Sequence, residues 1–492
     1  MRESGPPKGG RAGPPKGGHY LLLMLALTAG CATNPATGKR ELSLMSEQQE
    51  IAIGQQNDVD VRREMGLYED RAWQEYVSSI GLRLSQVSER PTLPWHFAVV
   101  DVPAINAFAV PGGYIYITRG ILPFLDDEAQ LAGVLGHEVG HVTARHASQQ
   151  YSRSTGAGLG ILLGSIFVPA VRPFGQLAQS SLGVLFLKYG RDDELQADQL
   201  GVRYASRSGW DPAGIPAMLT TLGRLDEATD NKGVPNWLST HPAPENRVQQ
   251  VQAAVGQASI TTASRGTDRA DYLRRVDGLI YGDNPEQGVV QGRRFLHAKL
   301  RFAVDFPDGW DVINGQTQVV AREPGAEVFM LLQVIDRPIG RDLEDIALRN
   351  MERAGFRVVN GGPSTINGLD AFLGTFAGTI NDVGRVGVRA AFVAHNRTVF
   401  MMAGIAPVAS YDRYEPEITT SLRSFRPLTS AEAERIHPNR IDLYTARQGD
   451  TWQSIAQRQG GVIKPATLAI MNGHAVNEQP RAGERLKIVV AG

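Results

Sequence analysis

Two different hydrophobic patterns occupy two different parts of the chain. From about residue 45 to 255, apolar residues mostly recur at helical spacing around a few short alternating segments. From about 291 to 427, short alternating segments dominate, for example at 302–306, with two helical patterns near 342–354 and 411–423. The first region is therefore expected to be mainly helical with a small sheet, and the second to contain a mostly antiparallel sheet.

A third, shorter pattern covers about residues 441–491. It predicts a strand, two helices and a strand, with Asp450 or Thr451 capping the first helix. Polar stretches at 256–290, which includes a short helical pattern, and at 428–440 separate the three parts. These patterns together predict an α+β multidomain protein.

The N-terminus has the features of a bacterial lipoprotein signal. Basic residues precede an apolar run at 20–29, which is too short to cross a bilayer as a helix. The run ends in Leu-Thr-Ala-Gly-Cys, which resembles a lipobox, although Thr28 stands where an aliphatic residue is usual. We expect lipidation of Cys31, and Ala32 in place of Asp favours an outer-membrane anchor facing the periplasm. A plain secreted protein or a one-pass anchor is the alternative.

Composition narrows the class of protein. Hydrophobic residues make up 42% of the 492 residues and charged residues 21%, which is typical of globular protein. The formal net charge of −1 gives no support for nucleic-acid binding, and a single cysteine excludes an intrachain disulfide or a cysteine-based metal site. The expected parts are a signal peptide at 1–30, a first domain at 31–255, a linker at 256–290, an α/β domain at 291–427, a linker at 428–440 and a small module at 441–491.

The strongest chemical signal is the sequence His-Glu-Val-Gly-His at 137–141, within a helical pattern that begins with acidic residues. Two histidines four residues apart lie about 40° apart on one helix face, so both can reach one metal ion. Glu138 projects beside them and can take a proton from a metal-bound water without binding the metal itself. The pattern predicts a zinc hydrolase, and the alternative is a helix whose histidines only pack or form hydrogen bonds.

A third ligand is expected from Glu194, which lies one helical turn before Asp198. Glu194 would complete a two-histidine, one-glutamate site, and Asp198 could orient a ligand histidine by accepting its hydrogen bond. His146 also follows the motif. On a continuous helix it would point about 140° away from His141, so we expect it to be structural or to lie outside the ligand set.

At this point the chain resembles a known family. Three motifs follow one another along it: HEVGH at 137–141, ELQAD at 194–198 and STHP at 239–242. They recur in the same order in the HEXXH gluzincin family of CAAX prenyl endopeptidases and HtpX-like proteases, which the chain resembles. Within it, the chain is similar to the periplasmic lipoprotein branch, and the resemblance covers about residues 31–255. The multispanning members have transmembrane helices that are missing here, which argues against prenylated substrates.

The resemblance implies a role for several residues. One zinc ion per chain would be bound by His137, His141 and Glu194, with Glu138 as the general base and Asp198 supporting the ligands. His241 would stabilise the oxyanion or gate access to zinc, and Arg247 would support an acidic neighbour. An extended substrate would bind along an edge strand formed by Asn106, Ala107 and Phe108.

Three other segments carry weaker signals. Residues 155–187 are rich in glycine and nearly uncharged, and are expected to form a buried helix over the site or to touch a membrane surface. The sequence at 306–310 resembles the start of PsbP-like α/β/α domains, which usually bind partners. Residues 441–491 resemble LysM modules, which bind peptidoglycan, unless this copy serves only for protein docking. Because the module follows a linker, peptide hydrolysis is expected to survive its deletion.

Two functions remain open on this sequence. The first is a zinc endopeptidase that degrades misfolded or unassembled envelope proteins in the periplasm, anchored to the membrane by lipid and to peptidoglycan by its C-terminal module. The second is an envelope adaptor or holdase with a structural metal site. The intact set of His137, Glu138, His141 and Glu194 favours the first.

Overall fold

The structure is a computed structural model that describes residues 31–42, 45–150, 189–228, 237–242, 246–258, 269–335, 338, 340–380 and 383–492. The expected signal peptide at 1–30 and the segment at 155–187 lie outside these residues. Cys31 begins strand β1 (Cys31–Thr33), which pairs with β2 (Arg40–Leu42), and its lipidation stays a prediction. In the described ranges, no helix has an apolar stretch sufficient to span a membrane.

A three-stranded sheet forms the centre of the N-terminal region, residues 45–258. Its strands are β3 (His96–Val100), β5 (Tyr114–Thr118) and β4 (Ala107–Val110), in this order, with β4 antiparallel at one edge. Helix α2 (Glu47–Glu64) covers one face, while α3 (Arg71–Gln86) and α4 (Glu128–Thr143) pack on the other. The predicted mainly helical region with a small sheet is confirmed.

Further helices build up around α4: α6 and α7 pack against it, α9 packs on α6 and α7, and α8 packs on α7. The 3-10 helix η1 leads into α4, and α6 lies alongside α4 because glycines allow a close approach. A Cβ atom at Gly140 would lie 2.9 Å from the Ala197 carbonyl oxygen, and one at Gly201 would lie 3.1 Å from the His137 backbone nitrogen. The elements concerned are η1 (Arg119–Phe124), α6 (Arg191–Ser208), α7 (Gly214–Ala228), α8 (Trp237–Thr240) and α9 (Arg247–Gln257).

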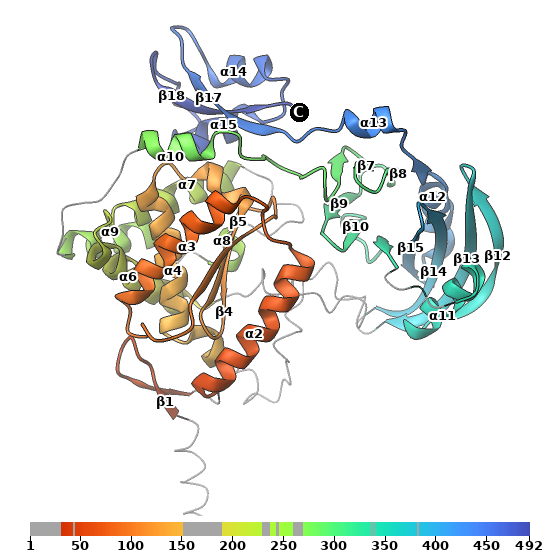
Figure 1. The fold of residues 1–492 in the computed structure, drawn as a ribbon, viewed down its shortest axis with the longest axis horizontal. Coiled ribbons are helices and arrows are strands. Elements are labelled where there is room, and N and C mark those ends of the chain that lie inside the picture. Colours follow the sequence, from red (N-terminus) through yellow and green to blue (C-terminus); the bar gives the residue numbers. More distant parts are fainter. Residues whose placement is uncertain are drawn as a thin grey trace, which may run out of the picture.

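The C-terminal module has the expected order of strand, helix, helix and strand, in β17 (Arg440–Thr445), α14 (Trp452–Arg458), α15 (Pro465–Met471) and β18 (Arg485–Val490). Its apolar side chains belong to the same hydrophobic core as those of the N-terminal region. The Lys487 ammonium is buried and donates to the Leu125 carbonyl at 2.8 Å and to Asp126 at 3.1 Å. The module is therefore packed against the start of α4 and is not held by a linker alone (Figure 1).

The two predicted linkers contact each other. Helix α10 (Arg269–Val276) buries Tyr272 and Val276 in the shared core. Beyond it, the Tyr281 amide donates to the Asn439 carbonyl at 2.8 Å, and Ile280 pairs with Arg440. The chain thus leaves the shared body and returns to it at adjacent points.

The middle region between these points is a sheet with a helix on each face. Helix α12 packs into one hydrophobic cluster and α11 into another, on opposite sides of a seven-stranded sheet with the order β12-β13-β14-β15-β11-β10-β9. Neighbouring strands are antiparallel, as predicted, and the predicted helices are present as α11 (Leu343–Arg353) and α12 (Tyr411–Arg423). The strands are β9 (Asp311–Asn314), β10 (Gln318–Arg322), β11 (Phe329–Val334), β12 (Arg357–Ile366), β13 (Leu369–Ile380), β14 (Gly384–His395) and β15 (Thr398–Pro407).

A second, four-stranded sheet completes the middle region, with the order β16-β8-β7-β6. It joins the two ends of this region, because β6 to β8 lie at its start and β16 at its end. The elements are β6 (Val289–Gln291), β7 (Arg294–His297), β8 (Phe302–Asp305), β16 (Arg426–Pro427) and the short helix α13 (Ser430–Glu434) that follows.

Candidate metal centre

Four buried side chains converge between α4, α6 and the end of α8. His137 and His141 come from α4, Glu194 from α6, and His241 from the residue after α8, and one ligand atom of each lies within 4.8 Å of the others. Zinc bonds of about 2.0–2.1 Å in a tetrahedral site put neighbouring ligand atoms about 3.4 Å apart. The Nε2 atoms of His137 and His141 are 2.9 Å apart, and each lies 3.5 Å from a Glu194 oxygen. These separations fit a zinc ion.

The helices place these groups through features visible in the sequence. Asp127 caps α4 by accepting from the Gln130 amide, and the two histidines follow on one face of that helix. Asp193, in the first turn of α6, accepts from the Gly190 amide at 3.2 Å at the start of that helix, so that Glu194 faces α4. Both ligand-bearing helices are thus fixed at their N-termini by side-chain contacts.

His241 occupies the fourth position of the cluster. Its Nδ1 atom lies 3.3 Å from His137 Nε2 and 3.1 Å from Glu194 Oε1. Its ring stacks on Trp237 at a centroid distance of 4.1 Å, and its Nε2 atom lies 3.4 Å from the Ala107 carbonyl. The ring is therefore held with Nδ1 toward the ligand atoms and Nε2 toward strand β4.

Glu138 lies next to the ligands, with its Oε1 atom 3.6 Å from Nε2 of His241. The side chain is buried, and neither carboxylate oxygen makes a hydrogen bond within the described residues. Burial raises the pKa of Glu138, although the neighbouring histidines His241 and His137 oppose this. A buried carboxylate whose oxygens make no hydrogen bond and whose pKa is raised suits a group that exchanges a proton with a water at the metal.

Asp198 and Arg247 support the ligands from behind. Asp198 Oδ1 lies 2.9 Å from His137 Nδ1, and Arg247 donates to both Asp198 oxygens, at 2.7 and 2.9 Å. Burial alone would raise the pKa of Asp198, but Arg247 and the His137 hydrogen bond lower it. In the same way, the neighbouring His241 and His137 hold the pKa of Glu194 well below its usual value despite burial. Both carboxylates are therefore ionised, so that Glu194 can bind a metal ion and Asp198 can hold the His137 ring.

The predicted substrate-binding residues lie beside this cluster. Strand β4 is at the edge of its sheet, and among the described residues no strand pairs with its outer side. Asn106 precedes the strand and accepts from the Ala107 amide through its side chain, while Phe108 stacks on Tyr116 at 5.1 Å, on the face covered by α2. The edge position is confirmed, whereas substrate binding by these residues stays a prediction.

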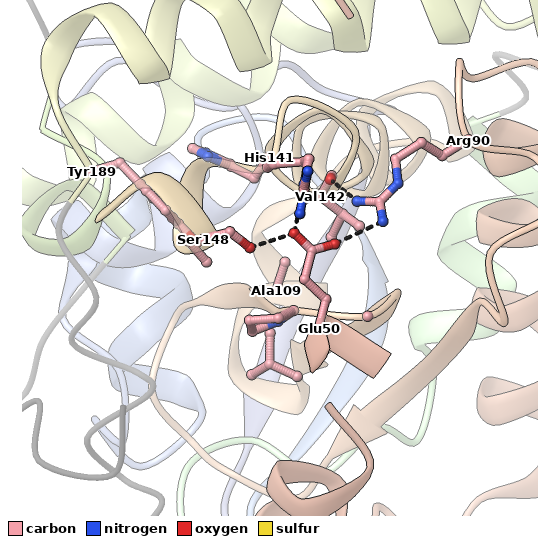
Figure 2. Close-up of a pocket in the computed structure, with 12 residues that line it drawn as sticks. Glu50, Arg90, Ala109, His141, Val142, Ser148 and Tyr189 are labelled. Carbon is pink, nitrogen blue, oxygen red and sulfur yellow. Dashed lines mark hydrogen bonds and ion pairs between the residues drawn. The ribbon is translucent and has the colours of Figure 1, made fainter. Parts of the chain in front are cut away.

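Sequence reasoning missed a buried network at the end of α4. Figure 2 shows Glu50 from α2 beside Arg90 and Ser148, in a small pocket that His141 also lines. Arg90 donates to Glu50 at 2.7 Å and to the Val142 carbonyl at 3.0 Å, and Arg145 and Ser148 also donate to Glu50. The network anchors the last turn of α4, and no motif marks it because its members are far apart in sequence.

Tyr189 is a second residue that the motifs did not reveal. Its ring stacks on His141 at a centroid distance of 3.9 Å and lines the pocket of Figure 2. Burial raises the pKa of Tyr189 well above its usual value, and the nearby Glu138 and Glu194 add to this. The phenol is therefore neutral and packs as one wall of the centre.

Two histidines one turn apart, a glutamate from a second helix and a buried glutamate beside them are the residues that a zinc metallopeptidase centre requires. Comparison with known proteins makes the class specific. Residues 71–255 match the model of Peptidase family M48. This match supports the expectation of a gluzincin of this family.

Similar proteins include two named peptidases. The beta-barrel assembly-enhancing protease of Escherichia coli (strain K12) is 32% identical over 235 residues, which are 46% of this chain and 47% of that protein. Mitochondrial metalloendopeptidase OMA1 of Schizosaccharomyces pombe is 31% identical over 187 residues, or 38% of this chain and 54% of that protein. The chain thus spans about half the length of the curated relatives it matches.

A solved structure also aligns with part of the chain. Cyanobacterial PsbP from Synechocystis sp. PCC 6803 covers 28% of this chain and 95% of its own, with 14% sequence identity and a TM-score of 0.24. A TM-score this low does not establish a shared fold, so the PsbP-like character of the middle region stays a prediction.

Proposed function

We propose that the chain is a zinc-dependent endopeptidase that hydrolyses peptide bonds of misfolded or unassembled cell-envelope proteins. The observation that carries the proposal is the buried Glu138 carboxylate, which makes no hydrogen bond within the described residues and lies beside the ligand set of His137, His141 and Glu194. A purely structural metal site needs ligands but no free carboxylate beside them. This distinguishes the proposal from the alternative of a non-catalytic adaptor or holdase.

The residues divide the chemistry between them. A bound zinc ion would supply Lewis acidity toward the scissile carbonyl and a water. Glu138 would accept the proton of that water and pass it to the leaving amine, a role for which its raised pKa is suited. Asp198, itself held by Arg247, would keep the His137 ring in the tautomer that offers Nε2 to the metal.

His241 is proposed to act as a gate. Its Nδ1 atom lies 3.1 Å from Glu194 and 3.3 Å from His137, in the position that an attacking water would need. With His241 there, His137, His141, Glu194 and His241 could all hold the metal, and four protein ligands are typical of closed structural sites and not of open catalytic ones. Activity would then require His241 to swing away, after which its imidazole could stabilise the oxyanion.

Substrates are proposed to pair with the edge of β4. An extended polypeptide would form main-chain hydrogen bonds with the segment from Ala107 to Phe108, next to the Ala107 carbonyl that His241 approaches. Asn106 would act by holding the start of the strand through its bond to the Ala107 amide. Backbone pairing carries little sequence information, so the class of substrate would be broad and unfolded.

Location and attachment belong to the same proposal. Lipid on Cys31 would anchor the protein to the outer membrane on the periplasmic side, and the C-terminal module would bind peptidoglycan. The beta-barrel assembly-enhancing protease among the relatives suggests envelope proteins as substrates. The domain boundaries expected from the sequence, with the LysM-like module at 441–491, form part of this proposal.

Glu138→Gln tests the proposal. The variant should bind zinc as the wild type does, because Glu138 is not a ligand, but should lose cleavage of casein. Ser206→Ala is a matched control, since it removes one buried hydrogen bond of α6 far from the centre. Equal casein cleavage by Glu138→Gln and wild type would refute the assigned base, and a wild type that binds no zinc would refute the enzyme.

A further inference from the structure

His141 is backed by a second histidine that is not a ligand. Its Nδ1 atom lies 2.9 Å from Nδ1 of His146, and His146 Nε2 lies 2.8 Å from the side-chain oxygen of Gln196. His141 and His146 are both buried, with 1% exposure each, so water cannot replace these contacts. The three side chains form one line that runs from the candidate metal position to helix α6.

The chemistry of a metal site fixes the direction of every hydrogen bond in this line. If His141 offers Nε2 to zinc, its Nδ1 carries the proton and donates it. His146 Nδ1 must then accept, which leaves the proton of that neutral ring on Nε2. Nε2 points at the Gln196 carbonyl oxygen, which can only accept. The atoms observed at each position are those that this sequence of donors and acceptors requires.

We propose that His146 and Gln196 form a relay that fixes the tautomer and the ring orientation of His141. His146 is thus a positioning residue for the metal and not a ligand. The inference rests on the zinc site proposed above and assigns to this site a second support, distinct from the Asp198–Arg247 pair behind His137.

The backbone explains how His146 reaches this place. Helix α4 ends at Thr143, and Arg145 adopts a left-handed conformation with a φ of 61°. This turn brings the next side chain back against the helix that precedes it. Glu50 holds Arg145 in place through a hydrogen bond of 2.7 Å to its Nε atom. The relay therefore depends on the network of Figure 2.

The position of Gln196 gives the relay a further consequence. Gln196 lies two residues after Glu194 on α6, whereas His141 and His146 belong to α4 and the turn after it. One line of hydrogen bonds thus joins the two segments that supply the ligands. An Asp193 oxygen lies 3.8 Å from His146 Nε2, and this distance is too long for a hydrogen bond.

Zinc affinity measured on the full chain tests the relay. The metal is removed with a chelator, and the zinc dissociation constant is then measured by competition with a chromophoric chelator, beside the melting temperature of the zinc-free protein. His146→Leu should weaken zinc binding about 10–100-fold, the usual effect of losing such a partner. Gln196→Leu, at a half-buried position, should weaken it less while the fold is kept. Ser206→Ala on the same helix is the control and should leave the constant unchanged.

A conservative variant separates positioning from packing. The side-chain oxygen of Asn at position 146 can occupy the place of Nδ1 and accept from His141, so His146→Asn should bind zinc nearly as tightly as wild type. Wild-type affinity in both His146→Leu and Gln196→Leu would overturn the relay, and so would His146→Asn as weak as His146→Leu. If the wild type binds zinc and either of these two results is obtained, the relay is refuted but the proposed function is not. A wild type without zinc overturns both.

Discussion

Zinc binding to this centre should release a proton from His137, and the affinity should therefore depend steeply on pH. Burial alone would lower the pKa of His137, but hydrogen bonds to Asp198 and Glu194 raise it to about 9 in the zinc-free protein. Burial holds the pKa of His141 well below its usual value, so that ring is already neutral. Zinc must then displace one proton, from Nε2 of His137.

The magnitude follows from that single proton. Below the pKa of about 9, apparent zinc affinity should fall about tenfold for each pH unit. Between about pH 9 and about pH 7 the loss is about a hundredfold, or about 3 kcal/mol. The stability of the zinc-free protein has the opposite trend: because the folded-state pKa is raised above the ordinary value of 6.5, this contribution is complete below about pH 6.5 and is lost as the pH rises through about 9.

The zinc affinity is measured across this pH range by competition with a chelator of known protonation constants. Calorimetry in two buffers of different ionisation enthalpy counts the protons released on zinc binding. Asp198→Asn removes one of the carboxylates that raise the pKa of His137, so the steep part of the curve should move to lower pH. A zinc affinity that is flat between about pH 7 and about pH 8.5, with no proton released, would refute the reasoning.

Three other predictions concern the rest of the chain. His241→Ala should keep zinc and either increase casein cleavage or cause self-digestion, whereas a drop in turnover of about a hundredfold would assign the oxyanion role in place of the gate. Cys31→Ser should move the protein from the membrane fraction to the supernatant, and unchanged sedimentation would contradict lipidation. Deletion from residue 441 onward should lower the melting temperature and casein cleavage. The deletion exposes the core that the module shares with Tyr272, and it removes Lys487 from the start of α4. A truncated protein with wild-type stability would instead support the separable module expected from the sequence.

The ligand set could be predicted because each part of it is local. His137 and His141 are one helical turn apart, and so are Glu194 and Asp198, so helical spacing alone places each pair on one face. The same reasoning placed His146 on a continuous helix and pointed it away from His141. It failed because a left-handed residue ends the helix first, and no residue type in that stretch announces such a turn.

The remaining contacts depend on tertiary packing between distant segments. Glu50 meets Arg145 across nearly a hundred residues of sequence, and Lys487 meets Leu125 across more than three hundred. Neither pair forms a periodic pattern or a motif, so a single sequence offers no signal for them. Helix α10 was expected within a linker, yet it buries Tyr272 in the core. The sequence could not show this, because the apolar face of a two-turn helix looks the same whether it packs on another element or faces solvent.

The adjacent exit and return of the chain at Tyr281 and Asn439 make the middle region a topological insertion. Its two ends are already joined by backbone hydrogen bonds, so a short turn in place of the whole region would leave the path of the surrounding body unchanged. A gene for the shared body could therefore gain or lose this region in a single recombination event without disturbing either the zinc ligands or the C-terminal module. The order of the three parts along the chain thus differs from their order in space, because the first and the last share one core and the second interrupts them.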